Sequence, residues 1–180
     1  MRPFPALVLF LTLPAIAIAE EKGTEVNING MKATTPADWK KEKPANLLRS
    51  YQFKLPGPKG SADAELSIYP ESNPNPAKSF PRWKATFIPP EGKTIDDIAK
   101  STKWDVNGAT VNVLDIAGGT WKFKERPQDP ASKEMLLDNY RVIWVIVAGK
   151  DEATHIRLAG PQATVDKHAK AFEEWVKALK

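Results

Sequence analysis

The stretch from Thr102 to Val113, TKWDVNGATVNV, is the clearest structural signal in this chain because it predicts a β-hairpin with a defined register. Its centre, Asn107-Gly108, favours a type I′ turn, in which both central residues need a positive φ. A two-residue loop then sets every cross-strand pair. The apolar face pairs Val106 with Ala109, Trp104 with Val111 and Thr102 with Val113, and the polar face pairs Asp105 with Thr110 and Lys103 with Asn112. Turn type and side-chain alternation therefore agree.

Four more segments have patterns typical of strands. Residues 47–55 and 62–68 alternate apolar and polar side chains across a loop rich in proline and glycine, which predicts an antiparallel pair. Residues 141–148 are apolar on both faces, which predicts a central strand covered on both sides. Residues 153–159 alternate again and end at Gly160-Pro161. Gly118-Gly119 follows the hairpin and predicts a bulge or a tight bend.

Helical spacing marks the end of the chain. Residues 165–179 carry one apolar stripe with ion pairs at i,i+4 on the opposite side, and Thr164 is a candidate N-cap. A shorter helix is predicted over residues 80–87, with Pro81 in its first turn, and another short helix or turn after Thr94. Together these elements predict an α+β fold with a central, mainly antiparallel sheet and helices packed on its faces.

The first nineteen residues, MRPFPALVLFLTLPAIAIA, have the three parts of a secretory signal peptide. Arg2 is basic, an apolar run follows, and Ala17-Ile18-Ala19 matches the small-x-small cleavage pattern. The uncharged run falls short of the roughly 20 residues that a membrane span needs. We therefore expect residues 1–19 to be removed, residues 20–180 to form one domain, and the mature protein to be exported, periplasmic or secreted, with no membrane span.

Composition narrows the functional classes. The chain has no cysteine, only two histidines and a formal net charge of +4. The positive charges are concentrated in residues 40–59, but the net charge is mild and lacks the clustered arginine of a nucleic-acid protein, so no nucleic-acid partner is expected. Motifs for nucleophilic, phosphate-binding and metal-dependent chemistry are missing from the sequence, so we predict no catalytic residue, no metal site and no cofactor.

Candidate binding residues come from three observations. The tryptophans are numerous: Trp39, Trp83, Trp104, Trp121, Trp144 and Trp175. Trp39 and Trp121 lie outside core-facing patterns and Trp83 is ambiguous, so these three are candidates for a stacking surface, although core packing is the usual role of tryptophan. His155 and Arg157 project from one strand face and can bind an anion or act as an acid–base pair.

Arg49 is the last candidate. It interrupts the apolar side of its predicted strand, where an unpaired charge would be costly. We expect it to reach a carboxylate, with Glu65 one possible partner, or a ligand-lined pocket. The alternative is a place at the sheet edge, where its guanidinium reaches water.

Several stretches resemble a group of small exported bacterial proteins of unknown function. They include Arg49-x-Tyr-x-Phe-x-Leu-Pro56, Arg82-Trp83-Lys-x-x-Phe87, the Asn107-Gly108 hairpin and Arg157-Leu-x-Gly-Pro161. The group has a longer uninterrupted helix where this chain has Phe80-Pro81. More remotely, the order of elements is similar to PsbP, Mog1 and DcrB-like domains. That resemblance implies an α/β/α sandwich that binds or stabilises other proteins.

The preferred functional hypothesis is a non-enzymatic binding or interaction module whose partner is another envelope protein. Two alternatives stay open. One is a cofactor-free hydrolase that uses His155, and the other is a glycan-binding domain that uses exposed tryptophans. The sequence leaves the oligomeric state open.

Overall fold

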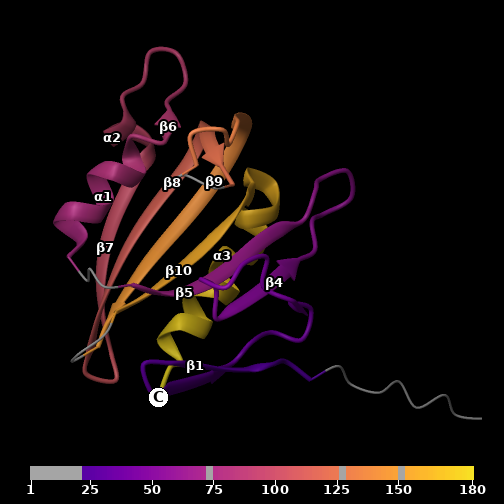
Figure 1. The fold of residues 1–180 in the computed structure, drawn as a ribbon, viewed down its shortest axis with the longest axis vertical. Helices are drawn as coiled ribbons and strands as arrows, with labels where there is room; N and C mark the ends of the chain where they lie inside the picture. The colour runs from indigo at the N-terminus through magenta and orange to yellow at the C-terminus, as the bar shows by residue number, and fades with distance from the viewer. Residues whose placement is uncertain (1–21, 72–74, 126–128, 150–152) are drawn as a thin grey trace, which may run out of the picture.

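The computed structural model describes residues 22–71, 75–125, 129–149 and 153–180 (Figure 1). The predicted signal peptide at residues 1–19 lies outside these ranges, so the structure does not bear on it. The described chain folds around one twisted sheet, which runs diagonally across Figure 1 with helices in front of it and behind it.

Within the described residues this sheet has eight strands, and every pairing in it is antiparallel. Its order is β3 (Lys40–Glu42), β4 (Tyr51–Leu55), β5 (Ala64–Glu71), β10 (Ala153–Pro161), β9 (Glu134–Ala148), β8 (Ala109–Lys124) and β6 (Phe87–Ile88), and β7 (Ala99–Val106) also pairs with β8. The predicted central strand lies within β9, between β8 and β10. Residues 142–147 are buried there, as expected for a strand covered on both faces.

The predicted hairpin is confirmed residue by residue. β7 and β8 meet at Asn107 and Gly108, whose φ angles are 50° and 78°. The observed pairs run from Val106 with Ala109 to Ala99 with Ile116, in the register that the turn predicts. The local turn chemistry therefore sets the register over eight residues of each strand.

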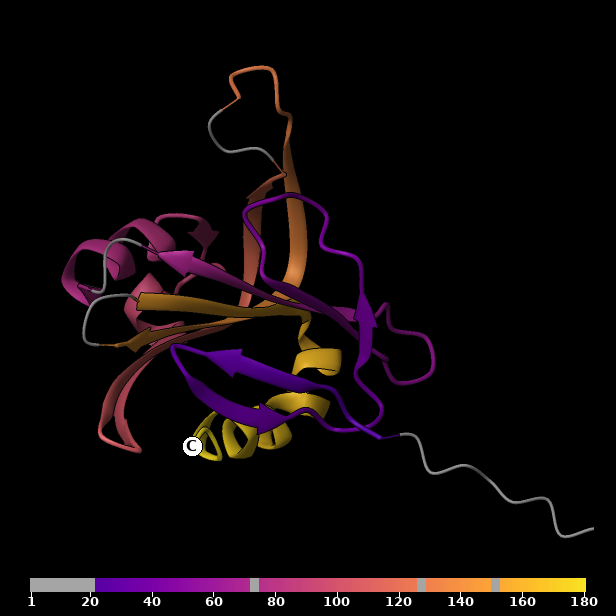
Figure 2. The ribbon, with the colours of Figure 1, turned by 60° about the horizontal axis from the view of Figure 1, so that its bottom comes forward.

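β8 and β9 continue well beyond the predicted strands, to 16 and 15 residues. Gly118 has φ 82°, and the register between β8 and β9 shifts on both sides of Gly119. The predicted bulge is thus confirmed. Because a bulge bends its strand and increases the local twist, the far ends of β8 and β9 leave the sheet as the long arm that rises from the molecule in Figure 2.

One face of the sheet, here called the α3 face, is covered by α3 (Gln162–Lys177) and a small hairpin of β1 (Glu25–Ile28) and β2 (Met31–Thr34). Figure 2 shows α3 and this hairpin on the same side of the sheet. Phe172, Trp175 and Val176 of the predicted apolar stripe are buried against the strands. Backbone hydrogen bonds between Lys32 and Lys180, at 2.7 and 3.2 Å, tie β2 to the end of the chain.

The opposite face, the α1 face, carries α1 (Pro76–Lys84) and α2 (Ile95–Ile98). Trp83 of α1 stacks on Trp144 of β9 with ring centroids 5.4 Å apart and planes 9° apart. The short helix predicted after Thr94 is α2, and Thr94 is its N-cap, whose backbone N–H donates to Asp97 at 2.7 Å. Helices therefore lie on both faces of the sheet, and the predicted α+β class is confirmed.

The middle helix begins earlier than the predicted residues 80–87. Asn75 is its N-cap, and the side-chain oxygen of Asn75 accepts from the Ala77 N–H at 2.9 Å. Pro76 opens the helix, so Pro81 lies in its interior, where the missing N–H removes one helical bond. Phe87 lies in β6 instead. The cap at Asn75 therefore determines where the helix starts, and it outweighs the preference of Pro81 for a first turn.

Two other predictions need correction. β4 begins only at Tyr51, so the alternation expected for residues 47–50 does not apply, and Arg49 turns toward the α1 face. Thr164 does not cap α3, which begins at Gln162. The Thr164 hydroxyl donates to the Ala62 carbonyl at 2.6 Å and so joins the first turn of α3 to the start of β5.

Candidate functional site

Polar side chains gather on the part of the α1 face formed by β4, β5 and β10. Antiparallel register places Gln52, Ser67 and Arg157 in one row across these three strands, and Trp144 of β9 continues the row. Side chains that lie directly opposite each other in a sheet share a face. The buried polar row therefore follows from the strand register, and it ends at the aromatic core under α1.

Glu65 bridges two arginines above this row. Arg49 Nη1 donates to Glu65 Oε2 at 2.8 Å, and Arg157 Nη2 donates to Glu65 Oε1 at 3.0 Å. Arg49 Nη1 also donates to Gln52 Oε1 at 2.7 Å. The arginine side chains are only 12% and 15% exposed, whereas that of Glu65 is 36% exposed. The carboxylate is thus the part of the network that solvent reaches most easily.

Aromatic rings of the arm formed by the far ends of β8 and β9 pack against the other side of Arg157. The centre of its guanidinium lies 5.4 Å from the Trp121 ring centroid and 5.9 Å from that of Phe123. Tyr140 stands beside Trp121 at 6.0 Å, and burial, together with the charge of Glu65, raises the pKa of the Tyr140 phenol. We call the set of Arg49, Glu65, Trp121, Phe123, Tyr140 and Arg157 the arginine–aromatic site.

The arginines of this site hold a carboxylate of the chain itself, because both guanidiniums contact that of Glu65 directly. Glu42 at the rim accepts from the Gln52 amide at 3.3 Å. Within the described residues, Arg157 Nε and Ser67 Oγ are buried without a hydrogen-bond partner, and the two residues are direct cross-strand neighbours. Buried polar groups without a hydrogen-bond partner are uncommon and costly, so these two atoms are available for further hydrogen bonds at the site.

Most of the candidates chosen from the sequence lie on the α1 face. Arg49, Arg157 and Trp121 belong to the arginine–aromatic site. Trp83 and His155 lie deeper, in edge-to-face contact at 5.0 Å. Trp121 and Trp144 join the two groups, with ring centroids 6.3 Å apart.

Trp39 lies on the α3 face. It packs against Trp175 at 5.6 Å and against Phe172 at 6.4 Å, and it is 3% exposed. Its position is that of a core residue.

The two alternative functions find little structural support at these positions. Five of the six tryptophans are buried, and Trp104 is half-buried, so the rings do not form an exposed platform. His155 is 2% exposed, with the rings of Trp83 and Tyr69 edge-on to it. The described residues contain no group of three or more side chains able to hold a metal ion.

Three residues of this region, Gln52, Phe123 and Tyr140, were not predicted from the sequence. Gln52 falls on the polar side of its predicted strand. Glu65 also falls on the polar side of its predicted strand, and it was predicted only as a possible partner of Arg49. Phe123 and Tyr140 lie in the parts of β8 and β9 that extend beyond the predicted strands. The signal that could have found Phe123 is the alternation that continues past the bulge from Trp121.

No family model matches the sequence, and no curated protein matches it. Among solved structures, CyanoP, the PsbP protein of Synechocystis sp. PCC 6803, has a TM-score of 0.52 and 10% identity, covering 93% of this chain and 96% of its own. PA94 of Pseudomonas aeruginosa, a protein of unknown function, has a TM-score of 0.48 and 15% identity, covering 88% and 96%. The likeness to CyanoP shows a PsbP-like fold. Among the helices in the described residues, none is long and apolar enough to cross a bilayer.

Proposed function

We propose that the chain is an exported, non-enzymatic binding protein of the bacterial envelope or the secreted space. The leader pattern of residues 1–19 and the resemblance to small exported bacterial proteins support the location. We propose further that the arginine–aromatic site binds a carboxylate on a partner protein. The sharing of Glu65 by Arg49 and Arg157 is the observation that carries this proposal.

Charge and geometry favour an acidic group as the ligand. A guanidinium presents several N–H donors in a plane and recognises carboxylates in paired geometry. Glu65 already occupies one such position from inside the chain, and each arginine contacts it through a single nitrogen. A partner carboxylate that approaches from the exposed Glu65 side would share these donors and give the two guanidiniums a second direct carboxylate contact.

Apolar surface beside the site favours a protein as the partner. Leu47 and Leu48 directly precede Arg49, and their exposed fractions are 104% and 77%. Two adjacent leucines this exposed cost free energy in water, and a partner surface would cover them. The proposed partner segment therefore carries a carboxylate next to apolar side chains.

A pair of blocked peptides tests the proposal, one with the sequence Leu-Leu-Glu-Glu and the other with Leu-Leu-Gln-Gln. Titration of the ¹⁵N-labelled protein should shift the Arg157 Nε–H and Trp121 indole resonances with the acidic peptide only. Arg157→Met keeps an apolar side chain over Trp121 but removes the positive charge. It should abolish the shift of the Trp121 indole resonance on addition of the acidic peptide. Equal shifts with both peptides, or an unchanged indole response in Arg157→Met, would show that the site does not recognise carboxylates.

A further inference from the structure

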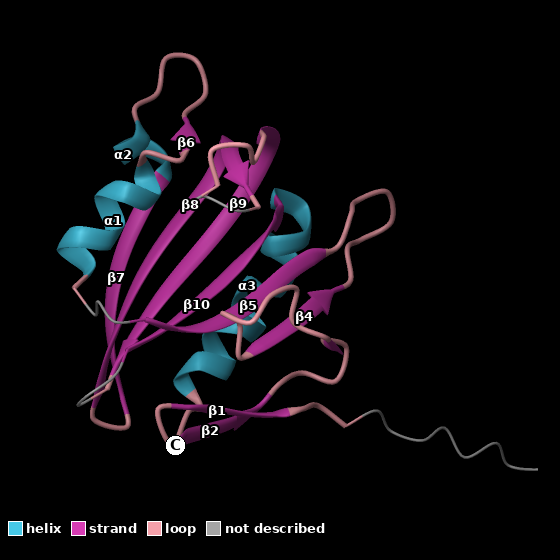
Figure 3. Cartoon of the chain, viewed as in Figure 1, coloured by secondary structure: helices cyan, strands magenta, loops and turns pink. Residues whose placement is uncertain are grey.

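β7 forms an open border of the sheet. It pairs with β8 on one side, and no second strand of the described residues pairs with it (Figure 3). Its exposed residues are Lys100, Ser101, Thr102, Lys103 and Asp105. An edge strand of eight residues offers a row of backbone donors and acceptors to another strand. This border lies apart from the arginine–aromatic site, which is built on β4, β5, β10 and the arm.

The hairpin determines which backbone groups of β7 face outward. Val106 and Ala109 close a two-residue turn, so they form a hydrogen-bonded pair. Hydrogen-bonded and non-hydrogen-bonded pairs alternate along an antiparallel ladder. The N–H and C=O groups of Ser101, Lys103 and Asp105 therefore point away from β8, toward the open border.

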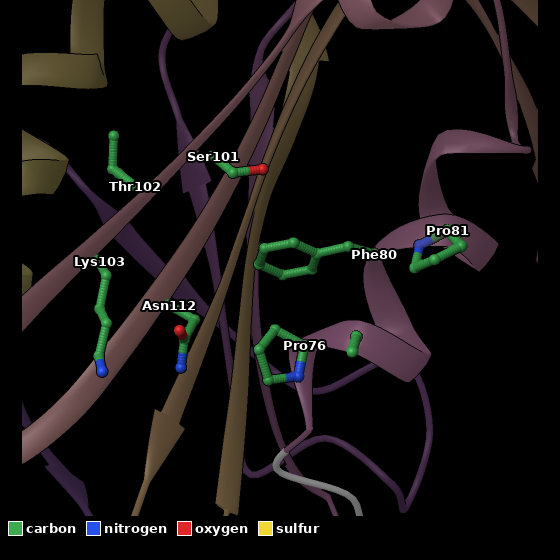
Figure 4. Close-up of a pocket in the computed structure, with 8 residues that line it drawn as sticks. Pro76, Phe80, Pro81, Ser101, Thr102, Lys103 and Asn112 are labelled. Atoms are coloured by element: carbon green, nitrogen blue, oxygen red, sulfur yellow. The ribbon is translucent and has the colours of Figure 1, made fainter.

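The helices leave this border uncovered. On the α1 face, a groove of about 430 Å³ separates Pro76, Phe80 and Pro81 of α1 from Ser101 and Lys103 of β7 (Figure 4). On the α3 face, a second groove of about 400 Å³ lies between β7 and residues 169–173 of α3. A further strand can thus approach β7 with room for its side chains on both faces.

We propose that β7 pairs with β7 of a second copy of this chain, antiparallel, about a two-fold axis that passes through Trp104. A two-fold axis perpendicular to the sheet keeps the α1 faces of both copies on the same side. Opposed residues must then belong to the same face, which restricts the pairing to registers centred on a single residue. Within the middle of β7 these are the registers centred on residues 102, 103, 104 and 105.

Charge selects one of the four registers. Centring on Trp104 places Lys103 opposite Asp105 of the second copy, twice by symmetry, and places the two Trp104 side chains opposite each other at a non-hydrogen-bonded position. Centring on Lys103 or on Asp105 opposes like charges, and centring on Thr102 gives no opposite-charge pair. Opposite charges and paired aromatics stabilise cross-strand positions, and like charges destabilise them. Lysines normally protect an edge from pairing, but in this register Asp105 neutralises Lys103.

A charge-swap series tests the register in the purified protein by sedimentation equilibrium. Lys103→Asp and Asp105→Lys each create two like-charge pairs, and each should raise the dimer dissociation constant about tenfold. The double swap restores both ion pairs and should return the constant to within about threefold of its original value. Asp105 Oδ1 also accepts from the Gly108 N–H at 3.2 Å, so thermal unfolding of each variant checks that the hairpin survives.

Cross-linking gives a second measurement, which the lack of native cysteine makes unambiguous. Trp104→Cys places the two sulfurs at the axis, so oxidation should yield a covalent dimer. Lys100→Cys, on the same strand, places them about 27 Å apart and should remain uncross-linked. A protein that stays monomeric at high concentration, single swaps without effect, a double swap that fails to restore the dimer, or equal cross-linking by both cysteines would each overturn the proposal.

Discussion

The guanidinium of Arg157 lies 5.4 Å from the centre of the Trp121 ring, although the two residues come from strands with β9 between them. Trp121 reaches this position because β8 bends at the bulge around Gly118 and Gly119. The ring shields a charge that would otherwise lose its water without compensation, and a cation–π contact of this kind contributes about 0.5–2 kcal/mol. The backbone conformation of the bulge thus positions the Trp121 ring for its cation–π contact with Arg157 in the arginine–aromatic site.

Substitution of Gly118 should therefore affect the site at a distance. Gly118 has φ 82°, so Gly118→Ala should cost about 1–2 kcal/mol in the free energy of unfolding and shift the Trp121 indole resonance. Gly60→Ala is the matched control, because Gly60 has φ 86° and a Cβ added there would meet no atom within 4 Å. The control should lose similar stability and leave the Trp121 signal unchanged. Similar Trp121 shifts in both variants would contradict the positional role of the bulge.

The charge of Glu65 should also have a measurable effect on the pKa of the Tyr140 phenol. Burial raises the pKa of Tyr140 most, and the negative charge of Glu65 raises it further. Glu65→Gln should lower this pKa but leave it above the ordinary value of about 10. Absorbance titration at high pH measures it in a Tyr51→Phe, Tyr69→Phe background, where Tyr140 is the remaining tyrosine of the three. An unchanged pKa would mean that the carboxylate of Glu65 is not near the phenol in solution.

The raised pKa of Tyr140 also makes stability depend on pH in the alkaline range. Below the unfolded-state pKa of about 10 the phenol is neutral in both states, and its contribution to stability is fully present. Above that pH the unfolded chain ionises first, so stability falls as pH rises through the higher folded-state pKa. Glu65→Gln narrows the interval between the two pKa values. Urea unfolding between about pH 9 and pH 11 should therefore show a shallower loss of stability in the variant, and an equal loss would contradict the coupling.

The α3 face depends on Phe172. This ring is 1% exposed and lies 6.4 Å from Trp39 and 6.1 Å from Trp175. Phe172→Ala should lower the free energy of unfolding by about 3–5 kcal/mol, because it leaves a cavity between α3 and the sheet. Glu174→Ala, on the exposed side of the same helix, should change it by less than about 0.5 kcal/mol. Chemical denaturation that shows a loss below about 1 kcal/mol for Phe172→Ala would contradict this packing.

Short sequence motifs predicted those elements whose backbone geometry the motif itself determines. Asn107-Gly108 predicted both the turn and its register, and Gly118-Gly119 predicted the bulge. Asn29-Gly30 carries the same Asn-Gly signal and forms the β1–β2 turn, with φ 51° and 83°, yet this hairpin was not predicted. Its strands are only four residues long, and alternation over so few residues is a weak signal.

The arginine–aromatic site was less accessible to sequence reasoning, because it depends on long-range register. Glu65 meets Arg157 only because β5 and β10 pair as neighbours, although the two residues are 92 positions apart in the chain. Trp121 meets Arg157 only after the bulge turns the end of β8. The expectation that Arg49 reaches the carboxylate of Glu65 is confirmed, because a charge beside an apolar strand needs a partner. The expected strand boundary was wrong.

Removal of the leader is the prediction that decides where the protein works. The pattern Ala17-Ile18-Ala19 places the cut before Glu20. Full-length chain expressed in a bacterial host should yield exported protein whose mass and N-terminal sequence begin at Glu20. Signal peptidase needs a small residue at Ala19, so Ala19→Phe should block cleavage and leave the uncut chain in the membrane fraction. Ile18→Phe changes the tolerant middle position of the pattern and should be processed normally. Uncut wild-type chain in the membrane fraction, or equal processing of both variants, would contradict export by this route.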